Sequence, residues 1–313
     1  MEPLTLEGQV NRQIEKGCIS TKKEIEAYLK TTSYYLINHN YEKYLFHDGK
    51  LAFFTVQDYK WLEETNEKIS KEVLLLVLRC ERIIRNKIAD EYSYYCKDNG
   101  YAYFTINSFI VDVFDYPNIG TDEDRNAVKT AFIDECWTVY AKKKKNLDAK
   151  YHFSNIESVP PFVIAHYLTF GQIRTFFKLL NKDIKERIVN SFDLKISEFN
   201  NVVEKLNYLR NACAHGEFIL DFDTLKGKKI SNSKFHPYIY NPHFILNKNK
   251  VSLFATIAHC SYLLQDNITF FKSIMRNILE IAHYNKKGSV NVNSLLLSLG
   301  LSSDCKTVQS TFK

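Results

Sequence analysis

The chain has 313 residues, 45% of them hydrophobic and 14% aromatic, so it can bury a large core and is neither disordered nor fibrous. Its 10 glycines and 6 prolines are few, which favours long helices joined by short turns. The net charge of +6 fits contact with phosphate chains but is also common in proteins that never bind them. Composition therefore favours a mainly helical protein, with one large domain or two modest ones.

The seven cysteines form no CxxC pair and have no regular spacing, so neither a disulfide scaffold nor a zinc site is indicated. The N-terminus lacks the apolar core of a signal peptide, and the longest strongly apolar run, Val73 to Leu78, is too short to span a bilayer. We therefore expect a cytoplasmic protein with no membrane partner, no metal and no cofactor.

The first fifty residues predict two amphipathic helices. "EGQVNRQIEKG" is ended by Gly17, and "KKEIEAYLKTTSYYLI" is capped by Thr21. The short, apolar, β-prone segment from Lys50 to Asp58 predicts a short strand or hairpin, and the helical pattern begins at Asp58. An N-terminal helical region over residues 1–56 is the predicted first part of the chain.

A central bundle helix is predicted from Glu72 to Tyr95, with a buried stripe that includes Cys80. Glu81 and Arg85 are spaced i, i+4 with the glutamate first, which favours an ion pair on one face of the helix. A plain surface pair is the simpler interpretation of the same spacing.

Residues 97–160 predict a loop with short elements, followed by a helix over 122–145. "PPFVIAHYLTFGQIRTFFKLL" then predicts a helix that starts at the two prolines, with a break or a close helix crossing at Gly171. "NKDIKERIVNSFDL" predicts another short helix, and Ser197 is the expected N-cap of the helix that carries "LNYLRNACAHGEFIL", residues 206–220.

Residues 218–250 predict a loop, and "SLFATIAHCSYLLQDNITFFKSIMRNILEIAHYN" one long helix. Residues 286–313, which include "SLLLSLGL", predict a weakly packed C-terminal tail after a helical core over 57–285. Lysines gather in two apparent loops, and they are either solvated or contact RNA phosphates: Lys142, Lys143, Lys144, Lys145, Lys228 and Lys229.

The helix from Glu198 carries an apolar stripe through Phe199, Val202, Val203, Leu206, Leu209 and Cys213. Arg210 lies about 40° from Leu206 around this helix, inside that stripe. A buried guanidinium needs a carboxylate or a phosphate from outside, because an unpaired buried charge costs several kcal/mol.

His215 lies about 140° from Arg210 on a regular helix, so the two side chains do not share a face. A helix that ends at Ala214, before Gly216, would free His215 to turn back toward Arg210. Alternatively, His215 reaches the arginine of a second copy across a two-fold axis.

These residue types suit RNA cleavage without a metal. An imidazole can take a proton from a ribose 2′-hydroxyl or give one to the leaving oxygen, and a guanidinium binds phosphate oxygens in a forked contact. Asn211 can orient either group by hydrogen bonding. The bare spacing also fits the ordinary end of a core helix, and both interpretations stay open on these residues alone.

The stretch "RNACAH", Arg210 to His215, resembles the arginine and histidine motif of HEPN domains, and four stretches in order resemble the Abi-like family of abortive-infection proteins. The four stretches are "LTLEGQVNRQIEKGC" with "TTSYYLINHNYEKYLF", then "LRCERIIRNKIADEY", "PPFVIAHYLTFGQIRTFFKLL" and "FNNVVEKLNYLRNACAHGEFIL". The resemblance implies an all-α, HEPN-like helical bundle that pairs as a homodimer. It implies catalytic roles for Arg210, His215 and Asn211 and supporting roles for Glu81 and Arg85, with Glu81 as the candidate partner of Arg210.

The resemblance implies a metal-independent endoribonuclease that acts as an abortive-infection, toxin-like effector against phage. An RNA or protein antitoxin is a candidate partner, which the sequence does not identify. A non-catalytic module that binds RNA or a partner protein of a defence system is the alternative.

Overall fold

The computed structural model describes residues 4–47, 50–112, 115–143, 153–220, 253–264, 276 and 289–299. These residues are mainly helical, as the composition predicts. The chain divides into two compact units, residues 1–77 with 208–313, and residues 78–207. Helices α4 and α9 each contribute residues to both units, and the predicted boundaries at residues 56 and 285 stay predictions.

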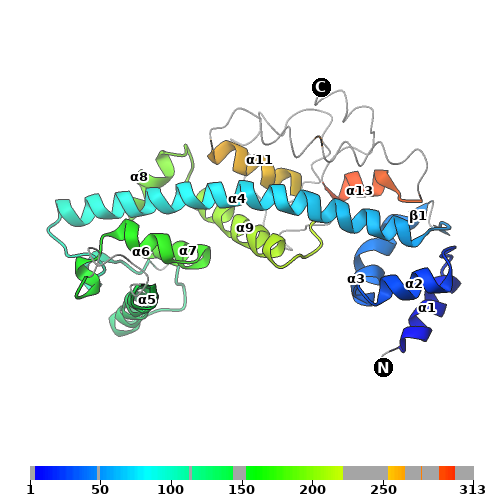
Figure 1. The fold of residues 1–313 in the computed structure, drawn as a ribbon. Coiled ribbons are helices and arrows are strands. Elements are labelled where there is room, and N and C mark those ends of the chain that lie inside the picture. Colours follow the sequence, from blue (N-terminus) through cyan, green and yellow to red (C-terminus); the bar gives the residue numbers. More distant parts are fainter. Residues whose placement is uncertain are drawn as a thin grey trace. The chain divides into compact units, whose positions relative to one another are not determined.

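The first unit holds both the N-terminal elements and the described C-terminal ones (Figure 1). Its elements are α1 (Leu6–Glu15), α2 (Lys22–Leu29), α3 (Tyr34–Leu36), the π-helix η1 (Ile37–Tyr41), the 3-10 helix η2 (Glu42–Leu45), β1 (Phe46–His47), β2 (Lys50–Leu51), the first part of α4 (Val56–Asp98), the end of α9 (Ile196–Ala214), α11 (Leu253–Leu263) and α13 (Val292–Ser298).

Local signals at the first two helices are confirmed. Thr21 caps α2 in a capping box, in which its hydroxyl accepts from the Glu24 N–H and the Glu24 carboxylate accepts from the Thr21 N–H. Gly17 follows the end of α1 with φ +103°, in the left-handed region that glycine adopts without strain. Sequence neighbours alone fix these ends.

The predicted strand from Lys50 is shorter than expected. β2 ends at Leu51, where it pairs antiparallel with Phe46 of β1, and α4 already begins at Val56. Asp58 explains the early start, because its carboxylate accepts from the N–H and hydroxyl of Thr55 at 2.7 and 2.8 Å and so caps the helix.

The described part of the predicted tail packs into the first unit, so the expectation of a weakly packed tail is wrong there. Val292, Leu295 and Leu296 of α13 are fully buried. The Tyr44 hydroxyl donates to Ser298 Oγ at 3.0 Å, and Ser298 Oγ donates to the Leu220 carbonyl at 2.8 Å. Val292, Leu295 and Leu296 lie on one face of this short amphipathic helix, whereas Leu297 is exposed, and the polar flanks obscure this pattern in the sequence.

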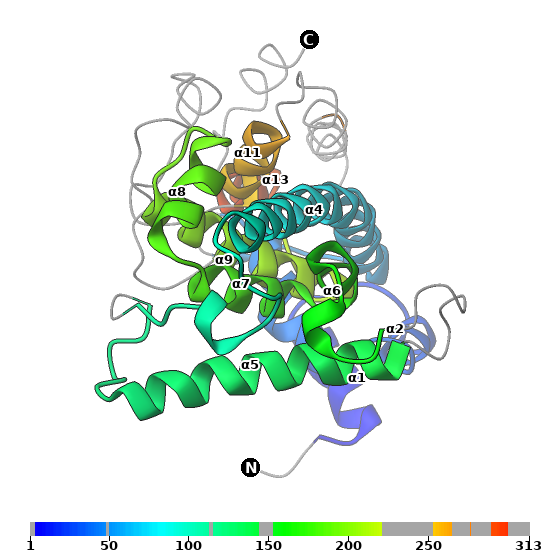
Figure 2. The ribbon, with the colours of Figure 1, turned by 90° about the vertical axis from the view of Figure 1, so that its left-hand side faces the viewer.

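The second unit contains the predicted helix at Asp122 and the helices that follow the two prolines. Figure 2 shows α5 beside α6 and α7. Its elements are the rest of α4, the 3-10 helix η3 (Ile106–Ser108), α5 (Asp122–Lys143), the 3-10 helix η6 (Ile156–Ser158), α6 (Pro161–Tyr167), α7 (Phe170–Leu179), α8 (Lys182–Asn190) and the first part of α9.

Two predicted helix boundaries in this unit are wrong. The break comes before Gly171, because Thr169 forms a capping box with Gln172 and starts α7 at Phe170. α9 starts at Ile196, so Ser197 lies inside its first turn instead of capping it. The Glu198 carboxylate caps the helix instead, accepting from the Lys195 N–H at 2.8 Å.

An aromatic cluster forms the core of the second unit. Tyr92 stacks on Phe109 at 5.2 Å and meets Phe176 edge to face at 5.0 Å. The Tyr92 hydroxyl lies 2.7 Å from Ser108 Oγ and accepts from the Phe104 N–H at 2.8 Å, so the buried phenol is satisfied.

Among the described residues, Cys18, Cys80, Cys96, Cys136, Cys213 and Cys260 are buried free thiols. None of the helices in the described ranges combines the length and apolar character that crossing a bilayer requires.

Candidate functional site

The "RNACAH" motif lies at the C-terminal end of α9, which is shaped by the apolar stripe on one side and by a glycine cap at its end. The six stripe residues, from Phe199 to Cys213, are all buried, as the periodicity predicts. The Arg210 side chain is half-buried and the His215 side chain is exposed. The stripe thus sets the helix orientation, and the polar motif residues lie at its margin.

A Schellman cap ends the helix directly after the histidine. The Glu217 N–H donates to the Ala212 carbonyl at 2.9 Å, and the Gly216 N–H donates to the Cys213 carbonyl at 3.3 Å. Gly216 has φ +68°, which a residue with a Cβ adopts only with strain. The predicted helix end at Ala214 is confirmed, and Gly216 is its cause.

His215 does not turn back to Arg210 within one chain. Its backbone N–H still donates to the Asn211 carbonyl at 2.9 Å, which continues the helical pattern by one residue. In the part of the chain that the structure describes, no hydrogen bond joins the imidazole to the guanidinium. The first of the two predicted solutions to the 140° separation is therefore not seen, and the two-fold solution stays a prediction.

Arg210 is available for an anion. Its Nη1 donates to Asn211 Oδ1 at 3.3 Å, and its Nε is buried without a hydrogen-bond partner. Among the described residues, none of the ion pairs involves Arg210. Asn211 thus contacts one of the two groups that it is predicted to orient, its catalytic role stays a prediction, and the guanidinium retains unused donors.

Asn66 was not among the predicted site residues, yet it holds the segment that follows the motif. Its Nδ2 donates to the Glu217 carbonyl at 3.1 Å, and its Oδ1 accepts from the Ile219 N–H at 2.8 Å. Asn66 lies on α4 and is 6% exposed. A signal was present in the sequence, because Asn66 shares the apolar face of Leu62 and Ile69, where a polar side chain requires a buried partner.

Glu81 and Arg85 form the predicted ion pair, with both side chains nearly buried. The Arg85 guanidinium also donates to the carbonyls of Ala165 and Leu168, the latter at 2.6 Å, so Arg85 holds the end of α6 against α4. These residues belong to the second unit and Arg210 to the first, so the pairing of Glu81 with Arg210 stays a prediction.

Two of the predicted RNA-contacting lysines are described. Lys142 and Lys143 lie in the last turn of α5 with exposed side chains, so both can reach a phosphate. Their contact with RNA stays a prediction. The other four lie outside the described residues: Lys144, Lys145, Lys228 and Lys229.

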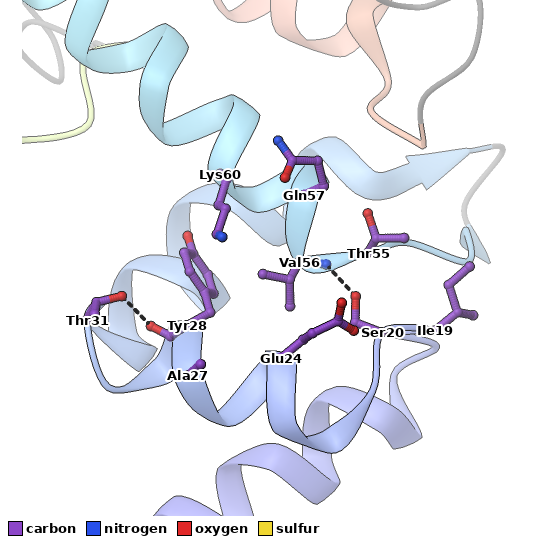
Figure 3. A pocket seen from close by; sticks show the side chains of 10 residues that line it. All are labelled: Ile19, Ser20, Glu24, Ala27, Tyr28, Thr31, Thr55, Val56, Gln57 and Lys60. Carbon is purple, nitrogen blue, oxygen red and sulfur yellow. Dashed lines mark hydrogen bonds between the residues drawn. The ribbon is translucent and has the colours of Figure 1, made fainter.

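A hollow of about 650 Å³ between α2 and the start of α4 has polar groups that serve the fold (Figure 3). Ser20 Oγ accepts from the Val56 N–H at 3.0 Å, and the Thr31 hydroxyl donates to the Tyr28 carbonyl at 2.9 Å. Hydrogen bonds from Thr21 lower the pKa of Glu24, whose carboxylate completes the capping box. This hollow therefore holds few groups free for a ligand.

Comparison with known proteins supports the resemblance to the Abi-like family from residue 27 on, whereas the stretch "LTLEGQVNRQIEKGC" precedes the matched region. The family model of Abi-like proteins matches residues 27–221, which include α4, α9 and the whole motif. No curated protein and no solved structure has significant similarity to the chain. Because the matched region covers more than half of the sequence, the chain belongs to the Abi-like protein family.

Proposed function

We propose that this Abi-like protein is a HEPN-type endoribonuclease, which cleaves RNA without requiring a metal and acts as a toxin-like effector of abortive infection. Family membership suggests a role in abortive-infection defence. The observation that carries the enzymatic proposal is the half-buried Arg210 guanidinium, whose Nε has no partner, five residues before an exposed histidine. A buried cation without a carboxylate is costly unless an anion from outside completes it.

The proposed chemistry needs one imidazole and one guanidinium. His215 takes the proton of the ribose 2′-hydroxyl, the 2′-oxygen attacks phosphorus, and the bond from phosphorus to the 5′-oxygen breaks. Return of that proton from the imidazolium to the leaving oxygen gives a 5′-hydroxyl end and a 2′,3′-cyclic phosphate. Arg210 neutralises the charge that develops on the non-bridging oxygens, and Asn211 orients Arg210.

The proposed active unit is a homodimer in which the motifs of two copies face one phosphate. Arg210 and His215 lie on different faces of α9, so one copy does not direct both side chains at the same phosphate. In a two-fold dimer, Arg210 of one copy and His215 of the other can face that phosphate together. Mixing inactive Arg210→Ala protein with inactive His215→Ala protein should restore cleavage, since mixed dimers contain one native set. A mixture that stays inactive after subunit exchange contradicts the composite site.

Cleavage of labelled single-stranded RNA in EDTA tests the activity itself. Wild-type protein should cleave and His215→Ala should not. His166→Ala is the matched control, because His166 is also an exposed histidine near the C-terminal end of a helix. RNA that is bound but left intact by the wild type would favour the alternative of a non-catalytic RNA-binding module.

The proposed setting is the cytoplasm, where the substrate RNA lies and where an RNA or protein antitoxin would hold the effector silent. Co-purification of the tagged His215→Ala protein from its native host, followed by sequencing of bound RNA and mass spectrometry, tests for that antitoxin.

A further inference from the structure

A second hollow in the first unit lies directly against the motif turn. It has a volume of about 320 Å³ and is bounded by η1, by one face of α4 and by Cys213, Ala214 and Gly216. We call it the motif pocket. Its size is at the small end for ligand pockets, which span roughly 300 to 1,000 Å³.

Ser70 gives the motif pocket a polar group that the fold does not use. The residue is 7% exposed and lines the pocket, and its Oγ has no hydrogen-bond partner. A buried hydroxyl without a partner costs free energy that an alanine would avoid. An acceptor or donor that enters the pocket would satisfy it.

Two carboxylates on α4 make the pocket attractive to N–H groups. One oxygen of Glu63 accepts from the Tyr28 hydroxyl at 3.2 Å, which leaves its other oxygen. Glu67 is exposed and lies 3.8 Å from Lys71 Nζ, a loose pair that leaves its carboxylate accessible. Burial, and then the charges of Glu63 and Glu67, raise the pKa of Tyr41, so its hydroxyl remains a donor.

These groups select against phosphate and in favour of an amino-bearing ring. Ionised carboxylates repel phosphate and accept hydrogen bonds only, so a nucleotide can enter base first with its phosphate outside, beside the exposed Lys71. Leu36, Leu74 and Cys213 supply apolar walls for the faces of a ring. Protein carboxylates accept from the exocyclic amino group of cytosine in the same manner.

We propose that the motif pocket binds a nucleobase that carries an exocyclic amino group, next to the RNA bond held at the motif. This inference rests on the proposed ribonuclease function. Cytosine, adenine and guanine present an amino group to the carboxylates, whereas uracil presents one N–H between two carbonyl oxygens, which the carboxylates repel. RNA-binding proteins read unstacked, single-stranded bases through hydrogen bonds of this kind.

Binding to catalytically blocked protein tests the pocket without requiring cleavage. Full-length His215→Ala protein is titrated against fluorescein-labelled uridine hexamers in which one central base is uracil, cytosine, adenine or guanine. Hexamers with an amino-bearing base should bind about five- to tenfold more tightly, the value of one hydrogen bond. Equal binding of all four hexamers overturns the proposal.

Two variants in this background locate the preference. Ser70→Ala and Glu67→Gln should each reduce it to about threefold or less, because each variant removes one of the two groups that share this preference. Glu64→Gln, an exposed neighbour on α4 that does not line the pocket, should retain it. Ser70→Ala should not lower the melting temperature, since its hydroxyl has no partner to lose. An unchanged preference in both pocket variants overturns the assignment.

The pocket and the ribonuclease can fail separately. If wild-type protein cleaves RNA but the His215→Ala protein shows no base preference, the proposed pocket function is wrong and the proposed ribonuclease function stands. If the His215→Ala protein shows a base preference but wild-type protein leaves RNA intact, the pocket proposal is supported and the proposed ribonuclease function is wrong. Free cytidine monophosphate that binds as tightly as the cytosine hexamer would make the pocket a nucleotide site and overturn its role on RNA.

Discussion

Replacing Asn66 by alanine should destabilise the protein and displace the turn that follows the "RNACAH" motif. The Asn66 amide makes two hydrogen bonds to backbone groups of residues 217 and 219, and nothing else in the described chain bonds to these two groups from a side chain. Alanine removes both partners at once. The turn at Gly216 then depends on its Schellman cap alone.

The magnitude follows from the burial of the two backbone groups. Ile219 is fully buried, so its N–H loses its acceptor with no water to replace it, at a cost of about 1 to 3 kcal/mol. Glu217 is exposed, so its carbonyl can turn to solvent, and that loss is nearer to about 1 kcal/mol. We expect Asn66→Ala to lower the free energy of unfolding by about 2 to 4 kcal/mol.

Urea denaturation measures the decrease in the free energy of unfolding. RNA cleavage at temperatures well below the unfolding midpoint measures the effect of Asn66→Ala on the motif. Cleavage should fall by more than the unfolded fraction accounts for, because His215 lies two residues before Glu217. Asn99→Ala is the control: its amide donates only to the Tyr95 carbonyl four residues earlier, and its loss should cost less than about 0.5 kcal/mol. An Asn66→Ala protein as stable as this control would refute the reasoning.

Gly216→Ala should cost about 1 to 2 kcal/mol, because no atom lies within 4 Å of the new Cβ and only the left-handed backbone is strained; a stability equal to wild type in thermal unfolding would contradict this. Leu206→Ala should cost about 2 to 5 kcal/mol, since the side chain is fully buried, whereas the exposed His215→Ala should leave the melting temperature nearly unchanged. Equal losses of stability in Leu206→Ala and His215→Ala would instead indicate that His215 has a structural role. Burial raises the pKa of the Cys213 thiol from 9.0 to about 12. The unfolded thiol therefore loses its proton first, so its contribution to stability is present below pH 9 and is lost as pH rises toward 12. In Cys213→Ala, the urea midpoint should fall less steeply as pH rises above 9. An unchanged slope would contradict the role of Cys213 in this loss of stability.

Features that depend on close sequence neighbours were predictable. The capping box at Thr21, the Glu81–Arg85 pair and the helix end before Gly216 follow from contacts within four or five residues. The buried stripe on α9 follows from the helical period of its apolar residues. The same local signals misplaced a boundary where two residues compete to cap one helix, as Ser197 and Glu198 do. Only the packed helix decides which side chain reaches the free backbone groups.

The residue types of the motif, Arg210, Asn211 and His215, were likewise visible in the sequence, because a side chain's functional group is known from its identity. Their surroundings were not. Asn66 reaches the motif turn across 151 residues, and Tyr44 reaches Ser298 across 254. The pocket beside the motif likewise combines η1, α4 and the end of α9. Such long-range contacts form when apolar faces from distant parts of the chain are buried together, and no single stretch of sequence encodes them. The tertiary structure alone therefore decided what surrounds Arg210 and His215.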